Sequence, residues 1–194
     1  MKTVILLIDF TGHQALSTDP YSDNIRYSAL TEIISAGHIN KKECIFFSTT
    51  IPKTDFRLLE LKKMAENNGF KFIIPTDDEE KQISIIGDSL YSISYIKSKF
   101  LNFNINIVDT QIIVTGTNTS GCVFKNKDIG AYHWSKAGYK TKIYLPMCVE
   151  YENKGLNDLE KNLYGFASLY KKIKKEKCFD IEICKEFNDL ELSI

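Results

Sequence analysis

The sequence lacks the features that mark zinc-binding, secreted and nucleic-acid-binding proteins. Its five cysteines form no CxxC pair and its three histidines are scattered, so we predict neither a zinc site nor a disulfide framework. Unpaired cysteines suit a reducing compartment, and we therefore expect a cytoplasmic protein. The 25 basic residues balance 25 acidic ones, so no overall electrostatic field attracts nucleic acid or a membrane surface.

Long apolar runs are also absent. The first run, Val4–Ile8, is too short for the apolar region of a signal peptide, and no segment approaches a membrane span in length. At 194 residues the chain can bury a substantial core without disulfides or metals. We expect a single domain over residues 1–194, in which about residues 176–194 form a C-terminal extension or an edge strand.

What the sequence does contain is a repeated alternation of short apolar runs and amphipathic segments. The expected strands are Thr3–Ile8, Cys44–Ser48, Phe70–Ile74, the run that begins at Gln111, Lys142–Leu145 and Phe179–Cys184. The expected helices are Asp23–Ala36, Asp55–Asn68, Ser89–Leu101, Lys127–Ala137 and Asn157–Lys175, the last with Leu159, Leu163, Phe166 and Ile173 facing inward. This order predicts a three-layer α/β/α fold of the Rossmann-like kind, with a mostly parallel central sheet.

The most informative stretch is Gln111–Val123, QIIVTGTNTSGCV. An apolar strand leads into a turn of glycine and hydroxyl residues, in which Gly121 would let the backbone approach a ligand closely. A helix that began at or just after Cys122 would place this thiol at a helix N-terminus, where N–H groups and the helix dipole lower its pKa. This pattern predicts a nucleophile; the alternative is that Cys122 is a small buried apolar residue.

Asp9 directly follows the first expected strand. Right-handed crossovers bring the carboxyl ends of parallel strands to the same edge of a sheet, where open α/β proteins place their sites. Asp9 and Cys122 can therefore share one crevice. The alternative is that Asp9 only caps the turn that follows the strand.

Two of these segments resemble a known family. Ile8–Phe10 (IDF) and Val114–Val123 (VTGTNTSGCV) are similar to the isochorismatase-like cysteine hydrolases, in particular to the group that resembles carbamoylsarcosine amidase. The stretch NLYGFASLY at Asn162–Tyr170 adds to the resemblance, which covers residues 1–50 and 108–172. It implies an isochorismatase-like fold and a hydrolase of a small amide, carbamoyl or related C–N or C–O bond. It further implies a small-molecule substrate, no cofactor and, in many members, a homo-oligomer.

The resemblance also implies roles for individual residues. Cys122 would be the nucleophile and Asp9 its base. The backbone N–H groups of Cys122 and Asn118 would hold the oxyanion, with a cis peptide bond after Thr117 and with Thr119 and Gly121 beside the substrate.

The third catalytic residue of the family is a lysine expected within Ile85–Tyr95, and this window contains none. Lys81 is the nearest substitute, and Lys97 and Lys99 lie further along. This departure leaves open a catalytically inactive binding or scaffold protein of the same fold.

A nuclease is a second alternative. The order of elements also resembles that of the NYN/PIN-like ribonucleases, and Asp9, Asp88 and Asp128 could then hold Mg²⁺ or Mn²⁺. The turn after the fourth strand offers no carboxylate, however, although those enzymes need one there. The balanced charge also argues weakly against RNA, so we expect no nucleic-acid partner. The sequence GDSL at Gly87–Leu90 matches a serine-esterase block, but no DxxH block follows it.

Overall fold

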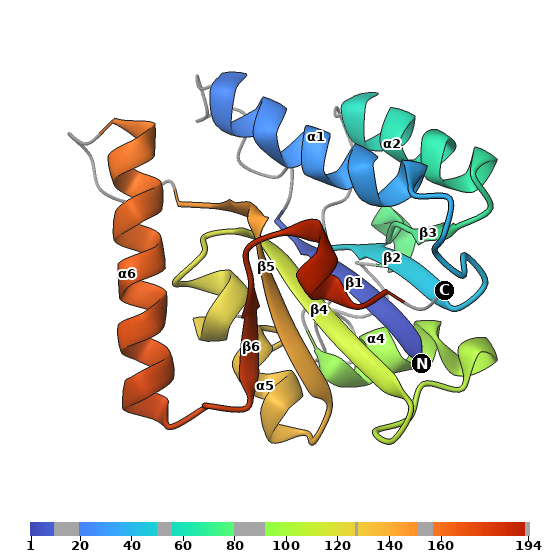
Figure 1. Cartoon of the computed structure of the whole chain (residues 1–194). Helices are drawn as coiled ribbons and strands as arrows, with labels where there is room; N and C mark the ends of the chain where they lie inside the picture. Colours follow the sequence, from blue (N-terminus) through green and yellow to red (C-terminus); the bar gives the residue numbers. More distant parts are fainter. Residues whose placement is uncertain (10–19, 50–55, 80–91, 127, 151–156, 193–194) are drawn as a thin grey trace.

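The computed structural model of the chain describes residues 1–9, 20–49, 56–79, 92–126, 128–150 and 157–192. Its sheet has six strands in the order β3-β2-β1-β4-β5-β6, and every pair of neighbours is parallel (Figure 1). The strands are β1 (Lys2–Ile8), β2 (Cys44–Ser48), β3 (Lys71–Ile73), β4 (Thr110–Thr117), β5 (Lys140–Val149) and β6 (Ile181–Cys184). The predicted α/β fold with a central parallel sheet is confirmed.

Helices cover both faces of this sheet (Figure 1). They are α1 (Pro20–Ser35), α2 (Phe56–Asn67), α4 (Ile93–Lys99), α5 (Ala131–Lys136) and α6 (Asp158–Glu176), with short turns η1 (Leu101–Phe103), η2 (Cys122–Asn126) and η3 (Phe187–Leu190). Each predicted helix and strand corresponds to one of these elements, although α5 begins at Ala131 rather than at Lys127. None of the helices in the described ranges has the length and apolar character needed to cross a bilayer.

The strand side chains alternate between two apolar cores, one on each face. Ile5, Leu7 and Ile113 pack with α1, α2 and the C-terminal segment, whereas Leu6 and Val114 pack with α4, η2, α5 and α6. A strand covered on both faces is apolar at nearly every position, which is why β1 could be read from the sequence. Burial of each such side chain contributes about 1.5–3 kcal/mol.

Helix α6 differs from the prediction in its first half. Leu169 and Ile173 are buried, but Leu159 and Leu163 are 64% and 58% exposed, so the prediction that these two leucines face inward is wrong. Their spacing continues the apolar stripe of α6 beyond the part of the helix that packs on the core. Figure 1 shows α6 standing at the outer edge of the molecule, beside β6.

The C-terminal segment folds back onto the sheet through polar contacts. Lys142 on β5 is fully buried, and its Nζ lies 2.9 Å from Glu191 Oε2 and 2.7 Å from the carbonyl oxygen of Asp189. Gln111 Nε2 donates to Thr3 Oγ1 at 2.9 Å and to the carbonyl oxygen of Leu190 at 3.3 Å. These buried polar groups therefore fix the segment over β1, β4 and β5.

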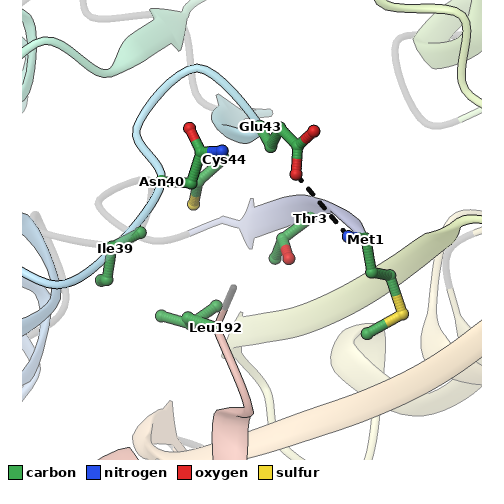
Figure 2. Close-up of a pocket in the computed structure, with 7 residues that line it drawn as sticks. All are labelled: Met1, Thr3, Ile39, Asn40, Glu43, Cys44 and Leu192. Carbon is green, nitrogen blue, oxygen red and sulfur yellow. Dashed lines mark ion pairs between the residues drawn. The ribbon is translucent and has the colours of Figure 1, made fainter. Parts of the chain in front are cut away.

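The first residues of the chain meet the same segment. Figure 2 shows that Met1, together with Thr3 of β1, lines the same small surface depression as Leu192. The Met1 amino group lies 3.6 Å from Oε2 of Glu43, another residue that lines the depression. This depression is too small to hold a ligand and lies at the amino ends of the strands, away from Asp9 and Cys122.

The Lys142–Glu191 ion pair predicts a loss of stability in acid. Hydrogen bonds from Lys140 and Lys142 lower the pKa of Glu191 to about 2. A carboxylate with a depressed folded pKa contributes stability above its unfolded pKa, about 4.3, and loses that contribution as pH falls towards its folded pKa. We expect Glu191→Gln to flatten the fall in unfolding free energy between about pH 4.5 and pH 2, as measured by urea denaturation.

Glu66→Gln is the matched control, because Glu66 forms an exposed pair with Lys62 on α2. It should leave the acid profile unchanged. A Glu191→Gln profile that runs parallel to that of the wild type would show that this ion pair does not stabilise the fold. The effect should be modest, because the Glu191 side chain is 59% exposed.

Candidate functional site at the carboxyl ends of β1 and β4

The carboxyl ends of β1 and β4 lie in close contact. The β1–β4 register pairs Ile8 with Gly116. Gly116 has a φ of +123°, and a Cβ built on it would lie 1.8 Å from the Ile8 carbonyl oxygen. Only glycine permits both the conformation and the approach. The contact brings Asp9 beside Thr117, at the start of the turn that carries Cys122.

Asp9 is held firmly where β1 ends. Its side chain is buried and its backbone takes a left-handed conformation with a φ of 45°. The Asp9 N–H donates to Thr49 Oγ1 at 2.9 Å, and the Thr49 N–H donates to the Leu7 carbonyl oxygen at 3.1 Å. The end of β2 thus fixes the direction in which the chain leaves β1.

Residues 117–121, which we call the turn, are closed by their own backbone. The Thr117–Asn118 peptide bond is cis, as the resemblance implied. The Asn118 carbonyl oxygen accepts hydrogen bonds from the N–H groups of Gly121 and Val123, both at 3.1 Å. Thr119 is fully buried, and its N–H donates to the Val149 carbonyl oxygen at 3.2 Å. Gly121 is buried as well, so Thr119 and Gly121 form the body of the turn.

Cys122 opens a single π-helical turn and not a long helix. This turn, η2, has five residues, so the dipole that Cys122 meets is that of one turn rather than of a full helix. His133 Nε2 lies 3.1 Å from the Lys125 carbonyl oxygen, near the end of η2. A Cβ on Gly130 would lie 2.5 Å from the Phe124 carbonyl oxygen, so the start of α5 is packed directly against η2.

The structure separates Cys122 from the other four cysteines. Cys122 is partly exposed, whereas Cys44, Cys148, Cys178 and Cys184 are buried. Burial raises the pKa of Cys44 and of Cys184 to about 12 and that of Cys148 to about 11. It also raises the pKa of Cys178. A thiol with so high a pKa is protonated near neutral pH and is a poor nucleophile.

Helix α6 supports the turn from the side. Glu150, which is almost completely buried, accepts hydrogen bonds from the N–H and the Oγ of Ser120, both at 3.2 Å. Lys172 Nζ donates to the Ser120 carbonyl oxygen at 2.6 Å. A Cβ on Gly165 would lie 2.8 Å from Glu150 Cβ, and Asn162 Oδ1 accepts a hydrogen bond from the Glu150 N–H at 3.0 Å. The Asn162–Tyr170 stretch thus positions the turn.

Three charged residues that contact the turn, Arg26, Glu150 and Lys172, were not predicted from the sequence. Arg26 on α1 is 2% exposed, and its Nη1 donates to Thr117 Oγ1 at 3.3 Å. A signal for it was present, because Arg26 precedes Leu30 by four residues and Ile33 by seven. It therefore occupies an apolar position of an amphipathic helix, where a charge calls for an explanation.

Of the three lysines considered for the third catalytic position, two lie within the described residues. Lys81, like Asp88, lies outside the described residues. Lys99 forms an ion pair with Glu79, and Lys97 Nζ lies 5.0 Å from the centre of the Tyr139 ring. Arg26 and Lys172 each donate a hydrogen bond to the turn, to Thr117 Oγ1 and to the Ser120 carbonyl oxygen respectively.

Two of the three carboxylates proposed for a nuclease, Asp9 and Asp128, lie within the described residues. Asp9 is buried at the end of β1, whereas Asp128 is exposed between η2 and α5. In the part of the chain that the structure describes, no group of three histidine, cysteine, aspartate or glutamate side chains could hold a metal ion.

Comparison with known proteins supports the fold. No protein-family model matches the chain, and no curated protein matches it either. A solved structure, described as "putative isochorismatase hydrolase from Oleispira antarctica", is similar in fold, with a TM-score of 0.50. The two chains share 14% identity, and the match covers 95% of this chain and 93% of the other. At this identity the likeness concerns the fold alone.

Proposed function

We propose that the protein is a thiol-dependent hydrolase of a small amide, carbamoyl or related C–N or C–O bond, with Cys122 as the nucleophile. The observation that carries the proposal is the contrast between Cys122 and the other cysteines. Cys122 is partly exposed beyond the carboxyl end of β4, whose neighbour β1 is followed directly by Asp9, whereas the other four thiols are buried. The motif resemblance and the fold likeness to a described isochorismatase hydrolase add support.

In the proposed reaction, Asp9 accepts the proton of the Cys122 thiol and the thiolate attacks the carbonyl carbon. A C–S bond forms, the carbonyl electrons move onto oxygen, and the N–H groups of Asn118 and Cys122 stabilise the oxyanion. Collapse of this intermediate breaks the C–N or C–O bond, and the leaving group takes the proton from Asp9. Water, deprotonated by Asp9, then hydrolyses the thioester and restores the thiol.

The setting of the reaction follows from the same proposal. The substrate would be a small molecule, and the chemistry needs neither a metal nor an organic cofactor. The reduced thiol that it requires suits a cytoplasmic location. A homo-oligomer would agree with the family that the sequence resembles.

The decisive test is the rate at which each cysteine reacts with iodoacetamide, followed by peptide mass spectrometry at pH 5–9. We expect Cys122 to react at least about tenfold faster than Cys178 at pH 6, because only a thiol with a lowered pKa is ionised there. Asp9→Asn should remove most of this advantage. Cys178 is the internal reference, since burial raises its pKa.

Equal rates for Cys122 and Cys178 would contradict the hydrolase proposal. A folded protein in which Cys122 is alkylated slowly and which hydrolyses none of the substrates would then favour the scaffold alternative. Cleavage of RNA that requires Mn²⁺ and is lost in Asp88→Asn would favour the nuclease.

A further inference from the structure

Arg26 presents a buried charge that the proposed reaction has not yet used. A guanidinium stays protonated at all physiological pH values, so it cannot lose its charge to relieve burial. Placing such a group at 2% exposure is unfavourable unless negative charge lies close by. Arg26 should therefore lie near anionic groups at the carboxyl edge of the sheet.

The surroundings of Arg26 supply such groups. Its hydrogen-bond acceptor Thr117 adjoins Gly116, which the register pairs with Ile8, so the guanidinium lies at the level where Asp9 leaves β1. Cys148 on β5 is in electrostatic range of both Arg26 and Glu150: burial dominates the raised pKa of Cys148, while Arg26 lowers it and Glu150 raises it further. Among the described residues, the charged groups around this edge include Asp9, Arg26 and Glu150, with Lys172 on α6.

The proposed chemistry needs a cation at this position. Before proton transfer the negative charge is on Asp9 and Cys122 is neutral; after it, Asp9 is neutral and the sulfur carries the charge. The total charge of the pair is the same in both states. A fixed cation next to the turn therefore stabilises the ionised pair throughout and favours movement of the charge towards the sulfur when it lies nearer the thiolate.

We infer that Arg26 is a positioning residue that compensates the negative charge shared by Asp9 and Cys122, since the window Ile85–Tyr95 contains no lysine for that role. The inference rests on the proposed function. Arg26 acts through Thr117, the residue that begins the turn, and reaches the site from the helix layer opposite to the one that contains η2.

Two other roles fit less well. An arginine that is 2% exposed is too enclosed to bind the anionic end of a substrate. Lys172 is a weaker source of the charge, because it is only partly buried and its Nζ is hydrogen-bonded to the Ser120 carbonyl oxygen. Lys172 therefore serves as the matched comparison.

The test is the pH dependence of Cys122 alkylation in the full-length protein, measured by peptide mass spectrometry from pH 4.5 to pH 10. In Arg26→Met, we expect the apparent pKa of Cys122 to rise by at least about one unit, which slows alkylation about tenfold below that pKa. Arg26→Lys should keep most of the wild-type rate. Lys172→Met should change the apparent pKa by less than half as much as Arg26→Met.

Two further measurements guard against a simple loss of folding. In Arg26→Ala, about 50 mM guanidinium chloride should restore part of the rate, because it can occupy the space left by the side chain; the same salt should not accelerate the wild type. Thr117→Val removes the acceptor of the Arg26 hydrogen bond at nearly constant shape, and should also raise the apparent pKa of Cys122. Circular dichroism establishes that each variant is folded.

The outcomes separate the inference from the proposed function. If wild-type Cys122 titrates near the ordinary thiol value, about 8.5, the proposed function itself fails. The second outcome is a wild-type Cys122 whose apparent pKa is well below the ordinary value of about 8.5 and is unchanged in folded Arg26→Met and Thr117→Val. In that case the hydrolase proposal stands and the role of Arg26 is overturned. An equal shift in Lys172→Met would also overturn it, because the effect would then not be specific to Arg26.

Discussion

Replacing Cys122 with alanine is expected to abolish hydrolysis, lowering kcat/KM by at least about 10³-fold. In nucleophilic catalysis, loss of the attacking atom leaves only the contribution of substrate binding and the oxyanion hole. The assay is the release of ammonia or amine from a panel of small primary amides, ureido acids and carbamates. The fold should persist, because Cys122 is partly exposed and its removal opens no large cavity.

Cys178→Ala is the matched control for this prediction. Cys178 is buried and lies outside the turn, so its removal should lower stability slightly and leave kcat/KM within about twofold of the wild type. Hydrolysis that survives in Cys122→Ala would show that the reaction does not pass through a Cys122 thioester. The nucleophile would then have to be sought elsewhere.

The second large effect is expected at Gly116. Substitution by alanine places a Cβ 1.8 Å from the Ile8 carbonyl oxygen, at a φ of +123° that L-residues rarely adopt. The clash is with backbone at the centre of the sheet, so β1 and β4 must separate. We expect the free energy of unfolding, measured in urea, to fall by at least about 3 kcal/mol, near the upper end of the range for single substitutions. Asp9 and the turn should be displaced together, with loss of rapid Cys122 alkylation.

Gly37→Ala provides the control for backbone entropy alone. Gly37 follows α1, and a Cβ built on it meets no atom within 4 Å. The substitution should be neutral or stabilising by about 0.4–1 kcal/mol, because alanine restricts the unfolded chain. A Gly116→Ala variant as stable as Gly37→Ala would show that the two strand ends are further apart than the structure indicates.

The extent to which sequence predicted the fold depends on which signal each element carries. The central strands were predictable because burial on both faces makes them apolar at nearly every position, as in Val4–Ile8. The error in α6 arises because Leu159 and Leu163 continue a periodic apolar pattern that tertiary packing does not use. Helix α5 begins only at Ala131, after η2 and the buried Ile129. Periodicity reports what a segment could bury, and not what is available to cover it.

The candidate site could likewise be predicted only in part from the sequence. Asp9 and the turn could be located because topology alone brings the ends of β1 and β4 to one edge. The glycine that controls the approach was not identified, because nothing in TGTNTSG distinguishes Gly116 from Gly121 without the Ile8 carbonyl opposite. Arg26 occupies an apolar position of its helix, a local signal that was overlooked, whereas its contact with Thr117, 91 residues away in the chain, leaves no local pattern.

The strand order also has a consequence for the way in which the chain reaches this structure. β1 lies at the middle of the sheet, and its neighbour β4 pairs Thr110 with Lys2 and Gly116 with Ile8. Strand β1 is therefore made before β4, and one of its edges stays uncovered until the chain has grown past residue 117. Such non-local pairing raises the contact order and slows folding. Until β4 pairs with it, the unpaired edge of Val4–Ile8 is a site at which nascent chains could associate with one another. The yield of folded protein should therefore depend on how soon β4 is synthesised and paired.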